Sequence, residues 1–73
     1  MKDTIESHLR VAESMISYCR EREAEQRAML AHGEYTDEHV RGLLYGHERY
    51  WCASAEGYEH EAETLRLLLN VAR

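Results

Sequence analysis

The sequence contains no proline and no phenylalanine, and Lys2 is its only lysine. Because proline breaks a helix interior, its absence is typical of long uninterrupted helices. The longest strictly apolar run, 67–69, is far too short to cross a bilayer. No apolar segment follows a basic start, as a signal peptide would require. We therefore expect a cytoplasmic protein that does not interact with membranes.

Basic residues are too few and too scattered to favour nucleic acid as a partner. The 73 residues include nine Lys and Arg against 14 Asp and Glu, which gives a net charge of −5. Phosphate binding draws on clustered Lys and Arg, whereas most arginines here stand close to an acidic residue. Apolar residues at 44% and charged residues at 32% are typical of an ordered helical protein. We expect such a protein, with no nucleic-acid partner.

Apolar residues recur at alternating spacings of four and three in two segments, a pattern that predicts two amphipathic helices. One stripe begins at Ile5 and ends at Leu30, and the other begins at Val40 and ends at Ala72. The polar Glu23 interrupts the first stripe near its centre. Gln26 is polar as well, and these two residues are expected to weaken the contact between the helices at this point.

Helix ends can also be placed from the sequence. Asp3 followed by Glu6 resembles a capping box, and Thr36 is a good N-cap for the second helix. Gly33 suits the left-handed residue just past a helix end. A connection this short forces the helices to run antiparallel. The sequence thus predicts an all-α, antiparallel hairpin as a single domain over 1–73, with a helix at 3–32, a turn at 33–36 and a helix at 37–72.

Gly46 and Gly57 lie inside the second predicted helix, where each costs about 1 kcal/mol relative to alanine. They leave two interpretations open: a kink, or a place where another helix approaches closely. The sequence does not decide between them.

More of the surface is apolar than one helix–helix contact can cover. The first helix has a second stripe, and the second helix is expected to outrun the first and to expose leucines at its end. Such surplus usually marks association, so we expect a homo-oligomeric helical bundle, of which a two-fold four-helix bundle is the simplest form. The residues expected at a subunit or partner interface are Val11, Met15, Tyr18, Tyr45, Tyr50, Leu65, Leu67, Leu68 and Val71.

Several polar residues have the chemistry of a site. Glu23 and His47 fall in one layer of the hairpin, where they form an acid–base pair or, as we favour, a hydrogen bond that fixes register. His8 and His60 align near each other with Glu56 close by, but the spacing is poor for a metal, and surface histidines are the better interpretation. We expect no metal, no cofactor and no catalytic residue.

Cys19 and Cys52 fall within about a helical turn of each other in the aligned hairpin. A disulfide is geometrically conceivable, because its Cα atoms must come within about 7 Å. In a reducing compartment two thiols are favoured. The sequence leaves the pairing open.

A planar, phosphate-bearing ligand between subunits is an alternative. Aromatic side chains would stack on its base and arginines would meet its phosphates; the residues are Tyr45, Tyr50, Trp51, Arg20, Arg41 and Arg49. This alternative requires arginines that are unpaired within one chain. Pairing of Arg41 with Asp37, or of Arg27 with Glu23, would weaken it.

Three hypotheses of function follow. The leading one is a non-enzymatic, oligomeric interaction protein that binds and regulates or inhibits another protein; its size and class are typical of phage and mobile-element products. The second is an oligomeric sponge for a nucleotide-like small molecule. The third is an enzyme that depends on a metal or on the His/Glu pairs.

Overall fold

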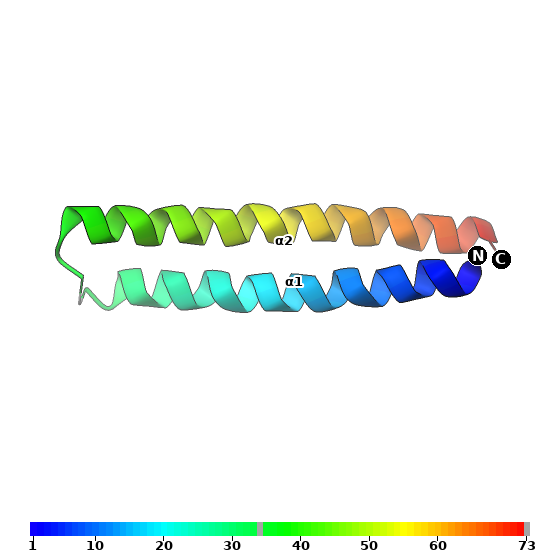
Figure 1. Ribbon diagram of the computed structural model, residues 1–73, viewed down its shortest axis with the longest axis horizontal. Helices are drawn as coiled ribbons and strands as arrows, with labels where there is room; N and C mark the ends of the chain where they lie inside the picture. The colour runs from blue at the N-terminus through cyan, green and yellow to red at the C-terminus, as the bar shows by residue number, and fades with distance from the viewer. Residues whose placement is uncertain (34, 73) are drawn as a thin grey trace.

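The computed structural model describes residues 1–33 and 35–72, and over them the chain is an antiparallel pair of α-helices. Helix α1 is Lys2–Ala31 and helix α2 is Glu38–Ala72. The pair forms a rod with extents of 54 × 13 × 13 Å, with the turn at one end and both termini at the other (Figure 1). The predicted all-α hairpin is confirmed, and each helix boundary lies within one residue of its predicted position.

The turn begins with the glycine that the sequence indicated. His32 donates its backbone N–H to the carbonyl of Ala28 at 3.0 Å, which extends the hydrogen bonding of α1 by one residue. Gly33 then adopts φ +68°, in the left-handed region that disfavours every residue with a Cβ atom. The chain therefore leaves α1 at the position where only glycine is unstrained.

Asp37, and not Thr36, caps the start of α2. Its Oδ1 accepts hydrogen bonds from the backbone N–H groups of His39 at 2.9 Å and Val40 at 3.1 Å. These are the second and third residues of the helix, which is the standard geometry of an aspartate N-cap. The expectation for Thr36 was wrong because both neighbours can cap, and the carboxylate forms the stronger bond at the positive end of the helix dipole.

The start of α1 also differs from expectation. The helix begins at Lys2 with Met1 at the cap position, and no side chain caps it. Asp3 therefore lies in the first turn, where its negative charge interacts favourably with the positive end of the helix dipole. The predicted capping box of Asp3 with Glu6 is wrong, because Asp3 is already inside the helix.

The core is thin and built largely of small side chains. Ala12, Ala62 and Leu65 form a buried cluster, against which Ile5, Leu9 and Ile16 pack. Further along, Ala55 and Cys19 are also buried. Alanine allows the two backbones to approach closely, but it buries little apolar area, so this contact stabilises the hairpin only modestly.

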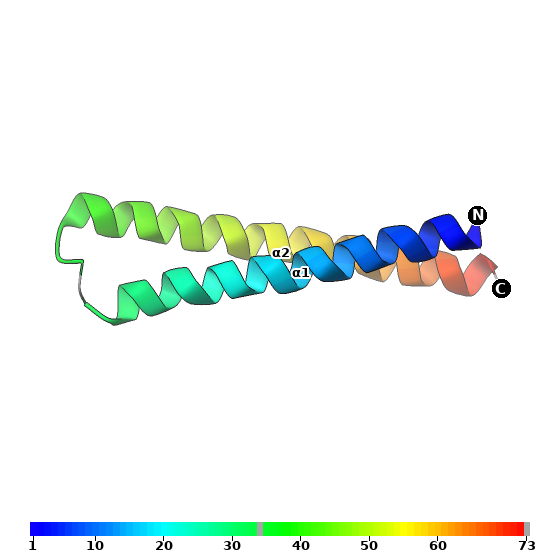
Figure 2. The same ribbon diagram turned by 60° about the horizontal axis from the view of Figure 1, so that its bottom comes forward.

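Helix α2 is continuous through the two glycines for which a kink was considered. Figures 1 and 2 show a single ribbon without a sharp bend from Glu38 to Ala72. A Cβ atom added at Gly42, Gly46 or Gly57 would meet nothing within 4 Å. The hairpin itself therefore does not require glycine at these three positions, although each costs about 1 kcal/mol relative to alanine.

The two helices end together, so α2 does not outrun α1 as expected (Figures 1 and 2). Leu65, expected at an interface, instead lies in the core of the hairpin. Leu67, Leu68 and Val71 are exposed because they face away from α1. Neither helix, over the residues described, is long and apolar enough to cross a membrane.

The cap at α2 can be tested by substitution. Asp37→Ala should lower the free energy of unfolding by about 1 kcal/mol, because two backbone N–H groups lose their acceptor. The measurement is urea denaturation followed by circular dichroism, at one fixed protein concentration. Thr36→Ala is the matched control and should change stability by less; a larger loss for Thr36→Ala would contradict the assignment.

Candidate functional site

The hairpin has two long flanks, one on each side of the plane through both helix axes. A helix turns by roughly 100° per residue, so Tyr18 and Arg20 on α1 point to opposite flanks. Tyr18 meets Trp51 across the hairpin, and Arg20 meets Glu59. We call the side with Tyr18, Tyr50 and Trp51 the aromatic flank, and the side with Arg20 and Glu59 the charged flank.

The charged flank is built around Glu23, a buried carboxylate. Its Oε1 accepts a hydrogen bond from Arg20 at 2.8 Å, and its Oε2 accepts one from Arg27 at 3.0 Å. Each arginine also reaches across to α2, Arg20 to Glu59 and Arg27 to Glu48. The polar centre of the first stripe is thus satisfied by two arginines that also bridge the helices.

The predicted pairing of Glu23 with His47 is wrong. Both oxygens of Glu23 are bound by arginines, and His47 is exposed. The residue that turns inward at this layer is Glu48, one position and roughly 100° further along α2. The layer therefore holds an arginine bridge between two carboxylates, and no imidazole.

These contacts shift ionisation in definite directions. The Arg20 guanidinium holds the pKa of the Glu23 carboxyl below its usual range. The Glu23 carboxylate raises the pKa of the Cys52 thiol, and burial raises it further. A thiol with a raised pKa is a poorer nucleophile at neutral pH. Both cysteines are free, so the predicted alternative of two thiols is the one observed.

Two of the three arginines considered for phosphate binding are engaged within the chain. Arg20 is paired with Glu23 and Glu59. Arg41 donates to the backbone carbonyl of Tyr35 at 3.2 Å, and not to Asp37 as considered. The pairing of Arg27 with Glu23, which was expected to weaken the ligand hypothesis, is present.

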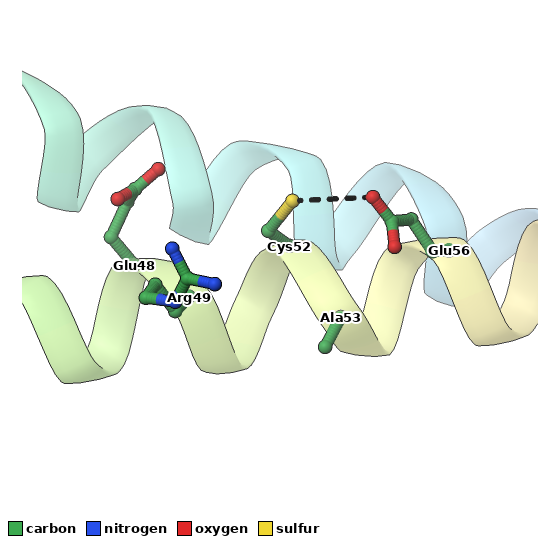
Figure 3. Close-up of a pocket in the computed structure, with 5 residues that line it drawn as sticks. All are labelled: Glu48, Arg49, Cys52, Ala53 and Glu56. Carbon is green, nitrogen blue, oxygen red and sulfur yellow. Dashed lines mark hydrogen bonds between the residues drawn. The ribbon is translucent and has the colours of Figure 1, made fainter.

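The remaining arginine, Arg49, lines an open hollow of about 190 Å³ on the side of α2 that carries Glu48 and Cys52. Figure 3 shows that its other walls are Glu48, Cys52, Ala53 and Glu56, all from the same helix. The Cys52 thiol donates to Glu56 Oε1 at 3.6 Å. Two carboxylates beside one guanidinium repel an anion, so the hollow does not suit a phosphate group.

The candidate metal residues do not form a coordination site. His8, His60 and Glu56 are all exposed. Within residues 1–33 and 35–72, no three side chains of His, Cys, Asp or Glu gather in a way that could hold a metal ion.

The aromatic flank carries a row of ring contacts that spans both helices. Tyr18 and Trp51 meet edge to face with centroids 5.6 Å apart, and Tyr50 and Trp51 do so at 5.0 Å. Arg22 places its guanidinium 5.3 Å from the centre of the Tyr18 ring. Edge-to-face contact between rings and a cation placed over a ring are each favourable interactions. Both tyrosines remain exposed, so the row is open to solvent.

Of the predicted interface residues outside the row itself, Val11 and Met15 lie in line with it on α1, whereas Tyr45 does not. Val11 is exposed and Met15 half-buried, at helical spacings of seven and three residues from Tyr18. Tyr45 is exposed but lies five residues before Tyr50, a rotation of roughly 140°, and so faces away from the aromatic flank. Leu43 is exposed but was not among the predicted interface residues; its position seven residues before Tyr50 was the available signal.

The Glu23 pairing predicts a pH dependence of stability. Because the folded-state pKa of Glu23 is lower than the unfolded value, its contribution is present above the unfolded pKa and is lost as pH falls through the folded pKa. Glu23→Gln should therefore lower the free energy of unfolding at neutral pH. It should also flatten the loss of stability that accompanies a fall in pH below about 5.

Denaturant unfolding at a series of pH values measures this. Glu25→Gln is the control, because Glu25 forms an exposed pair with Arg22, and exposed pairs contribute little. Equal pH profiles for the two variants would contradict the central role of Glu23.

The two thiols should differ in alkylation by iodoacetamide at about pH 8, near the ordinary cysteine pKa. Cys19 is buried and should react only when the hairpin opens. Cys52 should react more slowly than an unstructured cysteine, and faster in Glu23→Gln than in the native chain. Peptide mass spectrometry gives both rates; a native Cys52 as fast as the unstructured thiol would refute the assigned environment.

Comparison with known proteins gives no further guide to this site. No protein-family model matches the sequence, and no curated protein and no solved structure matches it significantly.

Proposed function

We propose that this chain is a non-enzymatic interaction module. In this proposal hairpins associate into a homo-oligomeric helical bundle, and the bundle binds and regulates or inhibits another protein. The observation that carries the proposal is the apolar surface left outside the single helix–helix contact. It comprises exposed large side chains from both helices: Val11, Tyr18, Leu43, Tyr45, Tyr50, Leu67, Leu68 and Val71.

The aromatic flank supplies the chemistry for a protein partner. Tyrosine, tryptophan and arginine are enriched among the residues that dominate binding energy at interfaces. Here Trp51 contacts Tyr18 and Tyr50, and Arg22 contacts Tyr18, and these contacts restrict the side chains before a partner arrives. A surface whose side chains are already restricted loses less conformational entropy on binding, which favours affinity.

The other two hypotheses receive less support. A nucleotide-like ligand needs arginines with no partner, and Arg20 is bound to carboxylates while Arg41 is bound to a carbonyl. Acid–base catalysis needs an imidazole beside a carboxylate, and His47 is exposed while Glu23 is held by arginines. The arrangement favours binding by surface contact.

The proposal predicts that a protein partner depends on the aromatic flank. Affinity capture from extracts of the source cells, read by quantitative mass spectrometry, should recover a partner with the native chain. Tyr18→Ala should weaken its binding by about tenfold or more, the effect typical of a central aromatic contact. Capture that is equal for both chains would contradict the proposal.

The matched control is Arg66→Ala on the charged flank. It removes the exposed ion pair between Arg66 and Glu13, so it perturbs the surface without touching the aromatic flank. Partner binding should survive this change. Circular dichroism of each variant ensures that a loss of binding does not reflect unfolding.

A further inference from the structure

Helix α2 carries a second heptad stripe on its outer side. The inner stripe, which contacts α1, includes Leu44, Trp51, Ala55 and Leu65, all buried or half-buried. A second set of residues lies one or two positions before the inner residues. Its members are also spaced alternately three and four residues apart along α2. Every member of this outer set is exposed. We call it the outer seam; it consists of Leu43, Gly46, Tyr50, Ala53, Gly57, His60, Thr64, Leu67 and Val71.

The outer seam has the composition of a helix–helix contact. Its large apolar members are strongly exposed: Leu43 by 52%, Tyr50 by 62%, Leu67 by 61% and Val71 by 85%. An apolar residue at every third and fourth position is the spacing by which two helices pack along their length. Four exposed apolar side chains on one such line are unfavourable in water and are covered when a second helix packs on them.

The small residues of the seam explain two of the glycines in α2, Gly46 and Gly57. Gly46, Ala53 and Gly57 lie between the large residues, and a Cβ atom at either glycine would meet only open space. The single hairpin does not need these glycines, so nothing within one chain offsets the helix stability that they cost. A second helix that packs closely against the middle of α2 would offset this cost. Of the two interpretations of the glycines, this favours a close approach over a kink.

The pattern is self-complementary when two copies of α2 run antiparallel. When Ala53 lies beside Gly57 of the partner subunit, the two-fold axis crosses the seam at the level of residue 55 along α2. The same register places Leu43 beside the partner's Leu67 and Tyr50 beside the partner's His60. Small residues thus meet at the axis, and leucines meet at both ends.

Charges beside the seam favour this direction. Arg49 and Glu63 border the seam on one side and form no ion pair within the part of the chain described. The antiparallel register brings Arg49 close to the partner's Glu63, and His47 close to the partner's Glu61, twice in each dimer. Glu56 meets its own copy near the axis, the one like-charge approach. Parallel packing instead brings Glu56 to the partner's Glu61 twice and leaves Arg49 unpaired.

We propose that a second copy of this chain docks antiparallel along the outer seam, with a two-fold axis near Ala55. This inference rests on the self-association in the proposed function and specifies its geometry. It places α2 between α1 and the α2 of the other copy. The dimer covers Tyr50 of the aromatic flank, whereas Val11 and Tyr18 on α1 stay uncovered for a different protein.

Disulfide trapping tests the direction and the register together. Leu43→Cys and Leu67→Cys chains, both carrying Cys52→Ser and one carrying a mass tag, are mixed and mildly oxidised. The expected product is the heterologous disulfide between positions 43 and 67. Homologous disulfides at 43 would show parallel packing and overturn the proposal.

Sedimentation equilibrium of the native chain separates this inference from the proposed function. A dimer that gives no trapped product would overturn the outer seam and leave self-association intact. In that case the aromatic flank is the other surface on which a second copy could pack. A monomer at all concentrations would overturn both.

A second variant tests the close approach at the axis. Gly57→Leu has open space in the single hairpin and should raise its thermal stability, because leucine favours the helix. At the dimer axis the same side chain has no room, so the dissociation constant should rise at least tenfold. Ala28→Leu, at an exposed position on α1, is the control and should leave dimerisation unchanged. An undiminished Gly57→Leu dimer would refute the inference.

Discussion

A hairpin of two helices provides one helix–helix contact, and the rest of this structure depends on that constraint. Each helix can bury one stripe of side chains against the other, and here the stripe is narrow and rich in alanine. A chain of 73 residues that buries so little apolar area is marginally stable by itself. Additional contacts must come either from polar bridges between the helices or from another molecule, and the two flanks divide these tasks.

The charged flank supplies polar bridges between the two helices within one chain. Glu23 is buried at the point where an apolar residue would continue the stripe, yet its two arginines satisfy both oxygens and extend to carboxylates on α2. A buried ion pair adds little net stability relative to a well-packed apolar pair, but removing one partner is costly. Its value lies in register, because a shift of one helix by a turn would leave a buried carboxylate unpaired. The bridge therefore fixes which aromatic residues meet on the opposite flank.

The architecture followed from the sequence because hydrophobic spacing and Gly33 each specify it through local chemistry. The errors arose where neighbouring residues compete for one role. Thr36 and Asp37 can both cap a helix, and His47 and Glu48 differ by one helical step, which decides between solvent and the interior. The division into flanks could not be predicted, because it depends on which residue of α1 lies opposite which residue of α2. Tyr18 was identified as apolar surplus, but its contact with Trp51 required the aligned pair.

The arrangement of side chains around α2 bears on how such a small hairpin could serve two partners. Its inner stripe is committed to α1, its outer seam faces away from the hairpin, and Glu48 and Cys52 occupy the charged side between them. A copy that packs on the outer seam covers Tyr50 of the aromatic flank but leaves Tyr18 and Val11 open to another protein, because those two residues belong to α1. The exposed glycines are then a consequence of assembly: they weaken the isolated helix and allow close packing with a second one. Stability and association are coupled in this way, so the folded hairpin should be most populated when it is paired.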